Sequence, residues 1–293
     1  MARVGFIGLG NMGGGMAANL AKAGHDVRAF DLSAEALERA EKAGCLPVAS
    51  AAEAAEGAEA VITMLPAGTH VEAVYAESVF GVADTAAVLI DCSTIDVETA
   101  KRVAEAAAAK GLTAVDSPVS GGIAAAAAGS LTFMVGGSNA GFERAKAFLD
   151  DMGKAVIHAG GNGAGQAAKI CNNMLLGATM IATCEAFALA EKLGLDPQTF
   201  YDISSVSSGQ SWSMTSYCPV AGVGPESPAD RDFAGGFAAA LMLKDLKLAM
   251  EAAQGSGVDT PMGKRAAELY GAFVDGGQGG VDFSGIIRTL QSE

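Results

Sequence analysis

The sequence predicts an α/β fold in which a doubly wound parallel sheet is followed by an all-helical domain. Short β-branched runs alternate with helical runs through the N-terminal half, and the β signals largely disappear after a glycine-rich break at 160–165. The length of 293 residues also exceeds what most single hydrophobic cores contain. We therefore expect two domains, residues 1–162 and 163–293, joined by a long helix from about residue 164 to 193.

Composition and charge limit the classes of partner. Hydrophobic residues make up 50% of the chain and the mean hydropathy is +0.31, which is enough apolar material for two cores. The net charge of −14 repels nucleic acid and anionic membranes, so we expect neither as a partner. An anionic small substrate would need local positive groups or backbone N–H donors.

Cysteine and histidine usage gives no sign of a metal site or of disulfides. The five cysteines form no Cys-x-x-Cys pair and are expected to be buried thiols in a reducing compartment. The three histidines have no partner at metal-ligand spacing. A strand-like run begins at Arg3 and Glu185 interrupts the longest apolar stretch, so we expect a cytoplasmic protein, although a processed organellar form would look the same.

The chain begins with a strand, a glycine turn, a helix and a second strand. Residues 3–7 form a short apolar and β-branched run, residues 11–23 have helical periodicity and end at Gly24, and residues 26–30 form the next strand. This order of elements is the βαβ unit of a parallel sheet.

The glycine turn carries the spacing G-x-G-x-x-G, with Asn11 and Met12 inside it and the glycines at Gly8, Gly10 and Gly13. The first glycine permits the tight turn, the second lets the backbone approach a pyrophosphate, and the third lets the helix pack closely on the strand. Since the motif has its strand before it and its helix after it, it predicts a Rossmann-like dinucleotide-binding domain.

Asp31 follows the second strand. An acidic side chain there accepts hydrogen bonds from the ribose hydroxyls of the adenosine and repels a 2′-phosphate, so NAD is expected in preference to NADP. The alternative is a turn residue that precedes the helix cap at Ser33.

Two further strands end near the expected cofactor. The segment AEAVITMLP ends at Pro66 and AAVLIDCST ends near Thr94, and helical runs follow at 69–76 and 97–110. Ligands of open parallel sheets bind beyond the carboxyl ends of the strands. We therefore expect Leu65, Pro66 and Thr94 to lie at the cofactor.

A strand at GLTAVDSP continues into VSGG, where Ser120, Gly121 and Gly122 offer a hydroxyl and open backbone N–H groups. Such a turn can hold a carboxylate without a basic patch, and an ordinary loop is the equal alternative. The alanine-rich segment 124–137 is expected to be a turn that leads into a strand, without a function.

The C-terminal half is predicted to be helical, with helices that begin at Asp196-Pro197, at Thr260-Pro261 and at Asp282. Between the first two lies a Ser, Gly and Pro-rich stretch, 204–228, which contains Trp212. A loop of this length inside a compact domain is usually functional, so we expect Trp212 to line or cover the site.

The segment GAGQAAKICNN places Lys169 in an apolar helix with Asn173 four residues later and Gln166 one turn earlier. Residues at i and i+4 share a helix face, so Lys169 and Asn173 can address one small ligand. A lysine that extends from a core helix to solvent is the alternative. Lys244 stands beside Asp245 on a later helix and could reach a cofactor or substrate, or form an ion pair facing solvent.

Four segments carry a resemblance to a known family. GFIGLGNMG, DSPVSGG, GAGQAAKICNN and GGFAAALMLKDL span nearly the whole chain in order, and together they resemble the β-hydroxyacid dehydrogenase family. The resemblance implies that Lys169 is catalytic and that Asn173 orients the substrate. It also implies substrate contacts from Ser120, Gly121 and Gly122, and NAD contacts from Leu65, Pro66, Thr94 and Lys244. Beside these we expect Trp212 at the substrate and Phe237 at the cofactor.

The resemblance also implies a reaction. The stretch SSGQSWSMTSYCPVAGV with the later FAGGF is most similar to members that oxidise a short 3-hydroxy acid of valine breakdown with NAD. Members that reduce tartronate semialdehyde, glyoxylate or succinic semialdehyde share the nucleotide site and the lysine, so they stay open as alternatives. A non-catalytic nucleotide-binding module is a remoter one, because relatives of that kind lack the lysine. A homodimer or homotetramer is expected.

Overall fold

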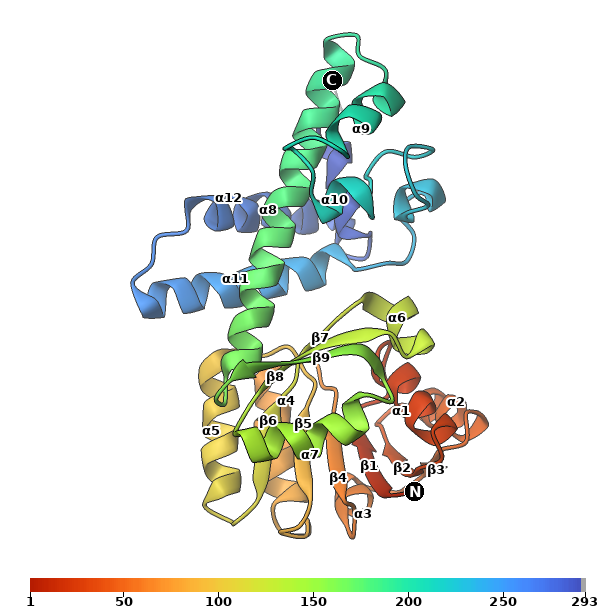
Figure 1. The fold of residues 1–293 in the computed structure, drawn as a ribbon, viewed down its shortest axis with the longest axis vertical. Helices are drawn as coiled ribbons and strands as arrows, with labels where there is room; N and C mark the ends of the chain where they lie inside the picture. Colours follow the sequence, from red (N-terminus) through yellow and green to blue (C-terminus); the bar gives the residue numbers. More distant parts are fainter. Residues whose placement is uncertain (291–293) are drawn as a thin grey trace. The chain divides into compact units, whose positions relative to one another are not determined.

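The computed structural model describes residues 1–290, and the last three residues of the predicted C-terminal domain, 291–293, lie outside them. Contacts between Cα atoms divide the chain into two compact units, Met1–Lys169 and Ile170–Glu293. The long helix α8 (Ala164–Lys192) begins in the first unit and continues into the second (Figure 1). The division at residues 162 and 163 stays a prediction.

The first unit is built on one mixed sheet. Within the described residues the strand order is β3-β2-β1-β4-β5-β6-β8-β7, and β9 pairs with β8. Strands β1 to β6 pair in parallel, whereas β8 runs antiparallel to both β6 and β7. The predicted doubly wound parallel sheet is confirmed, with an antiparallel addition at one side. The strands are β1 (Arg3–Ile7), β2 (Asp26–Phe30), β3 (Leu46–Pro47), β4 (Ala60–Thr63), β5 (Val88–Asp91), β6 (Thr113–Asp116), β7 (Val119–Ser120), β8 (Leu131–Gly136) and β9 (Gly153–Gly160).

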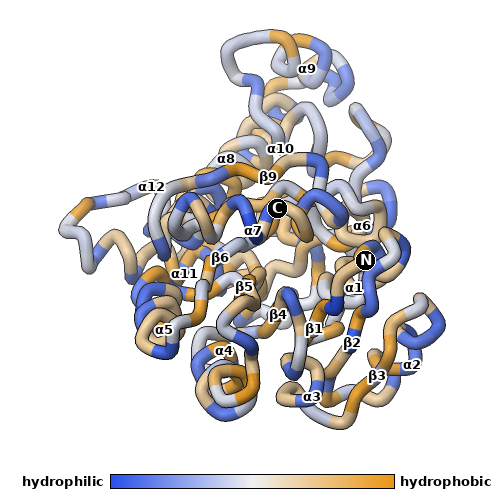
Figure 2. Tube along the Cα trace, turned by 60° about the horizontal axis from the view of Figure 1, so that its bottom comes forward, coloured by the Kyte–Doolittle hydropathy of each residue, from blue (hydrophilic) through white to orange (hydrophobic). Residues whose placement is uncertain are grey.

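Helices cover both faces of this sheet, because successive strand side chains point to opposite faces. Phe6 belongs to one hydrophobic core and its neighbour Ile7 to the other. The first core packs under α1 (Gly13–Lys22), α2 (Ala34–Lys42), α6 (Gly122–Ala128) and α7 (Asn139–Leu149). The second packs under α3 (Ala51–Ala55), α4 (Gly68–Val74), η1 (Tyr75–Val79) and α5 (Val97–Ala108). In Figure 2, β4 is mostly hydrophobic, while α5 alternates between hydrophobic and hydrophilic residues.

Two local expectations differ from the structure. Strands β4 and β5 end at Thr63 and Asp91, so Leu65, Pro66 and Thr94 lie in the loops that follow. The alanine-rich segment contains the helix α6 and not only a turn, because alanine has the highest helix propensity of all residues. Gly129, at a φ of 64°, ends that helix in the left-handed conformation.

The second unit is helical, as predicted. Asp196 caps α9 through a hydrogen bond from the Thr199 amide, and α12 begins at Pro261. The long loop after α9 is shorter than expected, because it contains α10 and η2. A hydrophobic core of the second unit contains Met242, Leu246, Tyr270 and Phe283. The elements after α8 are α9 (Pro197–Ser204), α10 (Trp212–Thr215), η2 (Pro228–Arg231), α11 (Ala239–Ser256), α12 (Pro261–Phe273), η3 (Val274–Gln278) and η4 (Phe283–Thr289).

The helix α8 corrects two expectations. By length and composition alone, it is the one helix among residues 1–290 that could cross a membrane, so Glu185 does not shorten its apolar stretch below that length. The core helix of a soluble protein meets the same criterion, and 39% of the most apolar window of α8 is buried. Cys171 on this helix is exposed, whereas we expected all five cysteines to be buried.

The packing of α3 on β1 depends on Gly5. A Cβ atom there would stand 2.3 Å from the Ala54 carbonyl oxygen, which belongs to the helix backbone and cannot move alone. We expect Gly5→Ala to lower the free energy of unfolding by about 1–3 kcal/mol, measured by chemical denaturation. Gly81→Ala is the matched control, because a Cβ there meets no atom within 4 Å. Equal stability of the two variants would contradict this account of the packing.

Candidate functional site

The glycine turn has the geometry that its spacing predicts. Gly8 adopts a φ of 97°, and a Cβ on it would lie 2.3 Å from the Met64 carbonyl oxygen. A Cβ on Gly13 would lie 2.0 Å from the Gly8 carbonyl oxygen, so the helix can approach the strand only with glycine there. Gly10 differs, because a Cβ on it would meet no atom within 4 Å. Its backbone is therefore open to a ligand.

A hollow of about 380 Å³ lies beside this turn. It is lined on one side by Gly10, Asn11 and the start of α1, and on the other by Arg39 of α2. Met12 at the N-cap of α1 gives no side-chain hydrogen bond to the helix amides. Free amides and the helix dipole favour a phosphate at such an N-terminus, so these residues fit a dinucleotide.

Asp31 holds the turn in place. Its carboxylate oxygens accept hydrogen bonds from the Leu9 amide at 2.6 Å and from the Ser33 amide at 2.8 Å. The carboxylate therefore joins the glycine turn to the start of α2, as the turn interpretation expected. Each oxygen can accept more than one bond, and the residue is only half-buried, so the ribose hydroxyls can still reach it.

The loops after β4 and β5 are joined by one serine. The Ser93 hydroxyl donates to Asp91 Oδ1 at 2.6 Å and accepts from the Leu65 amide at 2.8 Å. These bonds hold the segment of Leu65 and Pro66 beside the segment of Thr94. Pro66 is exposed and Thr94 is half-buried, at the carboxyl ends of their strands.

The predicted carboxylate-binding turn follows β7. Ser120 ends the strand and is half-buried, and Gly121 is the N-cap of α6 at a φ of 136°. Gly122 adopts a φ of 72°, with open space where a Cβ would stand. The turn therefore has a hydroxyl and glycine backbone on its open side, which suits an anionic group.

The start of α8 is held by buried polar groups. Asp116 at the end of β6 accepts hydrogen bonds from the amides of Gly163 at 2.6 Å and Gln166 at 2.9 Å. Burial raises the pKa of Asp116, and the amide hydrogen bonds oppose that rise. Lys169 lies one turn further along and is 8% exposed. A lysine this buried is not the solvent-reaching lysine of the alternative interpretation.

Asn173 and Lys244 belong to the second unit. Asn173 is 2% exposed, and its Nδ2 donates to Asp245 Oδ2 at 2.6 Å, while its Oδ1 accepts from Asn172 at 3.0 Å. Lys244 Nζ lies 3.4 Å from Asp245 Oδ1. Asp245 of this pair is buried, whereas the Lys244 side chain is 34% exposed, so both interpretations of Lys244 stay open.

Aromatic contacts place Trp212 and Phe237 in the same unit. The Trp212 ring stacks on Tyr217 with 4.8 Å between centroids, and one half of its surface is exposed. The Phe237 ring meets Phe283 at 5.8 Å, and its amide donates to Asp282 at 2.7 Å. The predicted residues thus divide between the two units, with Asn173, Trp212, Phe237 and Lys244 in the second.

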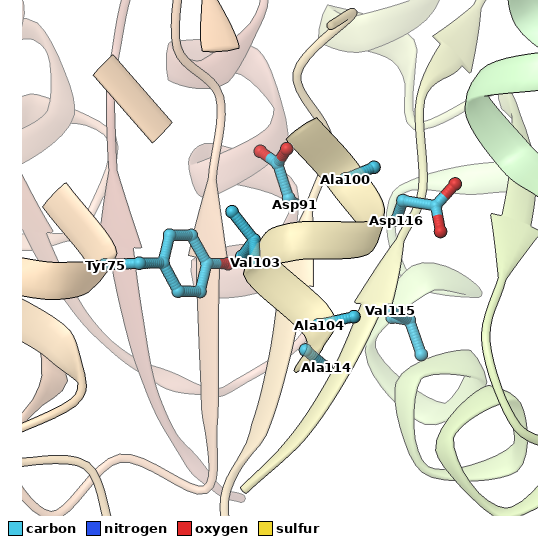
Figure 3. Close-up of a pocket in the computed structure, with 8 residues that line it drawn as sticks. All are labelled: Tyr75, Asp91, Ala100, Val103, Ala104, Ala114, Val115 and Asp116. Carbon is cyan, nitrogen blue, oxygen red and sulfur yellow. The ribbon is translucent and has the colours of Figure 1, made fainter. Parts of the chain in front are cut away.

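A small cavity lies between the interior strands β5 and β6 and the helix α5 (Figure 3). Its volume is about 10 Å³, roughly the space of one water molecule. Asp91 and Tyr75 line it, and Asp91 Oδ1 accepts bonds from Thr63 and Ser93, whereas its Oδ2 is a buried oxygen with no protein partner among the described residues. Burial raises the pKa of Asp91 to about 6, against these hydrogen bonds.

Sequence reasoning missed the carboxylates that support the site. Asp91 and Asp116 are the last residues of their strands, and only their distant partners show what they do. Asp245 was considered only as an ion-pair partner of Lys244, and its hydrogen bond with Asn173 is seen only in the structure. The one available signal was an aspartate at a strand end before a polar loop. Within residues 1–290 no group of three or more His, Cys, Asp or Glu side chains could hold a metal ion.

Family models match both parts of the chain. Residues 3–161 match the NAD binding domain of 6-phosphogluconate dehydrogenase. Residues 163–290 match the model described as NAD-binding of NADP-dependent 3-hydroxyisobutyrate dehydrogenase. The two models together cover nearly the whole chain.

Full-length relatives are similar throughout. A 3-hydroxyisobutyrate dehydrogenase of Pseudomonas aeruginosa is 51% identical, with all of both chains covered. An NAD-dependent L-serine dehydrogenase of the same organism is 46% identical and covers 99% of this chain and 98% of its own. A solved Mycobacterium tuberculosis 3-hydroxyisobutyrate dehydrogenase with L-serine superimposes with a TM-score of 0.95 at 46% identity, over 99% of each chain.

The pKa of Asp91 predicts how stability depends on pH. The folded pKa of about 6 lies above the value of roughly 3.9 in an unfolded chain. The stability from the protonated carboxyl is therefore fully present below about pH 4 and is lost as pH rises through about 6. Asparagine cannot ionise, so we expect the Tm of Asp91→Asn relative to wild type to rise by several degrees between about pH 4.5 and about pH 7.5.

The control is Asp84→Asn, which changes an exposed aspartate that accepts from the Ala86 amide. Its Tm difference from wild type should stay nearly constant over the same range. A constant difference for Asp91→Asn as well would show that Asp91 is already ionised at low pH in the folded protein.

Proposed function

Because the chain belongs to the β-hydroxyacid dehydrogenase family of NAD-dependent oxidoreductases that act on a CH–OH group, we propose that it is a 3-hydroxyisobutyrate dehydrogenase. The reaction would oxidise 3-hydroxyisobutyrate to methylmalonate semialdehyde in valine catabolism. The observation that supports this most is the buried Lys169 one helical turn before Asn173, in a chain whose full length matches such dehydrogenases.

The nucleotide is proposed to lie along the carboxyl edge of the sheet. The open backbone at Gly10, with Asn11, Met12 and the α1 amides, would hold the pyrophosphate, and Asp31 would accept the ribose hydroxyls. When bound, NAD supplies the acceptor for the hydride that leaves the carbinol carbon. Further contacts are proposed for Gly8, Gly13, Leu65, Pro66, Thr94, Phe237 and Lys244.

The substrate is proposed to be held at both ends. Ser120, Gly121 and Gly122 would bind its carboxylate through the hydroxyl and backbone amides, which an acidic chain needs for an anionic ligand. Lys169 would hydrogen-bond the hydroxyl and take up its proton as the carbinol is oxidised, and would return that proton in reduction. Asn173, whose amide is fixed by Asp245, would orient the same hydroxyl. Trp212 is proposed to line or cover the substrate site.

L-Serine is the second candidate substrate. One relative is named an NAD-dependent L-serine dehydrogenase, and the M. tuberculosis structure contains L-serine. L-Serine is also a 3-hydroxy acid, so the carboxylate turn and Lys169 would meet the same groups in it. The two substrates differ at the carbon between the carboxylate and the carbinol, which carries a methyl group in one and an ammonium group in the other.

Other features of the protein follow as proposals. We propose that residues 1–162 bind nucleotide, that residues 163–293 serve substrate binding and assembly, and that the protein is a cytoplasmic homodimer or homotetramer. Exposed apolar side chains on α8 support an assembly surface, since large exposed apolar residues commonly meet a partner. They are Leu175 and Leu189, and the exposed Leu193 directly follows the helix.

A substrate panel with both cofactors tests the function. We expect the highest kcat/KM with 3-hydroxyisobutyrate and NAD, a lower value with L-serine, and lower values still for the reduction of tartronate semialdehyde, glyoxylate and succinic semialdehyde. NAD should exceed NADP, because Asp31 repels a 2′-phosphate and Leu32 offers no charge to bind one. A kcat/KM with NADP equal to that with NAD would show that Asp31 does not select the cofactor, and a higher value with L-serine would replace the proposed substrate.

The role of Lys169 is tested by Lys169→Ala. We expect kcat to fall on the order of 10²- to 10⁴-fold, because the variant has no group to accept the hydroxyl proton. Binding of NADH, followed by fluorescence titration, should remain close to that of the wild type. Lys110→Ala, at an exposed lysine, is the control and should leave both quantities unchanged. Near-normal turnover of Lys169→Ala would overturn the assignment.

A further inference from the structure

Gln166 joins the first turn of α8 to the loop after β5. Its side chain is fully buried, its Nε2 donates to the Ser93 carbonyl oxygen at 2.7 Å, and its Oε1 accepts from the Ile95 amide at 3.1 Å. The two bonds lie on either side of Thr94, the residue proposed to contact NAD. One amide side chain therefore fixes this loop relative to the helix.

Asp116 holds the same turn from the neighbouring strand. Its two oxygens accept the amides of Gly163 and Gln166, where the helix dipole favours an anion. The packing is tight, because a Cβ on Gly136 would stand 2.5 Å from Oδ1 and one on Gly165 would stand 2.8 Å from Oδ2. The helix start cannot shift along the strand without breaking these contacts.

A cap for helix stability alone has a simpler form in this chain. Asp196 caps α9 from the position directly before the helix. The α8 amides donate instead to Asp116 at the end of β6. The buried side chain of Gln166 binds the loop after β5 and not its own helix. A local cap would stabilise the helix equally, but it would leave the position of the helix on the sheet unspecified.

We propose that Gln166 and Asp116 are positioning residues that fix Lys169 relative to the nucleotide loop at Thr94. Lys169 follows Gln166 by three residues, so both lie on one side of α8, one turn apart. Hydride and proton transfer require the reacting groups to be held closely in place, so a displaced first turn slows the reaction. This inference rests on the catalytic role proposed for Lys169.

The test uses substitutions that keep the size of each side chain. Gln166→Met removes both hydrogen bonds to the loop, and Asp116→Asn removes the charge at the helix start. We expect each to lower kcat for hydroxy acid oxidation on the order of 10- to 100-fold. The KM for the hydroxy acid should change by less than about threefold, because the carboxylate turn at 120–122 is untouched.

Matched controls separate positioning from general stability. Gln198→Met changes an exposed glutamine of α9, and Asp196→Asn changes the exposed cap of that helix. Both should keep the wild-type kcat. Each variant is assayed well below its own Tm, so that loss of folded protein does not lower the measured rate. The double variant Gln166→Met with Asp116→Asn should lose less than the product of the two single losses, since both side chains hold one turn.

The outcomes are distinct. A kcat for Gln166→Met within about twofold of wild type overturns the proposal, as does a change in KM larger than the change in kcat. Multiplicative losses in the double variant overturn the claim that the two residues act on one turn. An inactive Lys169→Ala beside a fully active Gln166→Met refutes only this inference, whereas an active Lys169→Ala refutes the proposed function itself.

Discussion

The first unit of this protein depends on a buried carboxylate that meets the amides at the start of α8. Removing the Asp116 charge from water is costly, which raises the pKa of this group, and the Gly163 and Gln166 amides offset part of that cost. The first amides of a helix in turn lack partners within the helix. The carboxylate and the helix amides therefore satisfy each other's hydrogen-bonding needs. As a result, the start of the helix that carries Lys169 is fixed at the end of β6.

The same arrangement recurs along the carboxyl edge of the sheet. Asp31 follows β2 and accepts amides from the glycine turn and from the start of α2. Asp91 ends β5 and accepts from Thr63 and Ser93, and Ser93 accepts the Leu65 amide. The loops that surround the proposed nucleotide position are thus held by aspartates at strand ends. Their flexibility is limited before any ligand arrives, which lowers the entropic cost of binding.

An acidic protein whose relatives act on hydroxy acids must bind anionic ligands without a large basic surface. The net charge of −14 would repel a carboxylate substrate and a pyrophosphate at long range. Backbone amides at Gly10 and at 121–122 supply positive ends of dipoles at short range, where they count most. Lys169, the residue proposed to meet the substrate hydroxyl, is only 8% exposed, so electrostatic interactions there are poorly screened by water.

The sequence by itself determined the alternation of strands and helices, the glycine turn and the helical second half, because each follows from local periodicity and from residues with special backbone freedom. It also indicated Lys169 and Asn173, which are four residues apart on one helix, and the turn at Ser120, whose residues are consecutive in the chain. The helix at α6 was missed because an alanine run was interpreted as a turn. The roles of Asp116, Gln166 and Asp91 were decided only by the tertiary structure, since the partners that show them (Gly163, Ser93 and Thr63, respectively) lie 28 to 73 residues away in the chain. Hydrogen bonds between residues so far apart in the sequence form only after the sheet has brought the strand ends together, so no local sequence pattern predicts them.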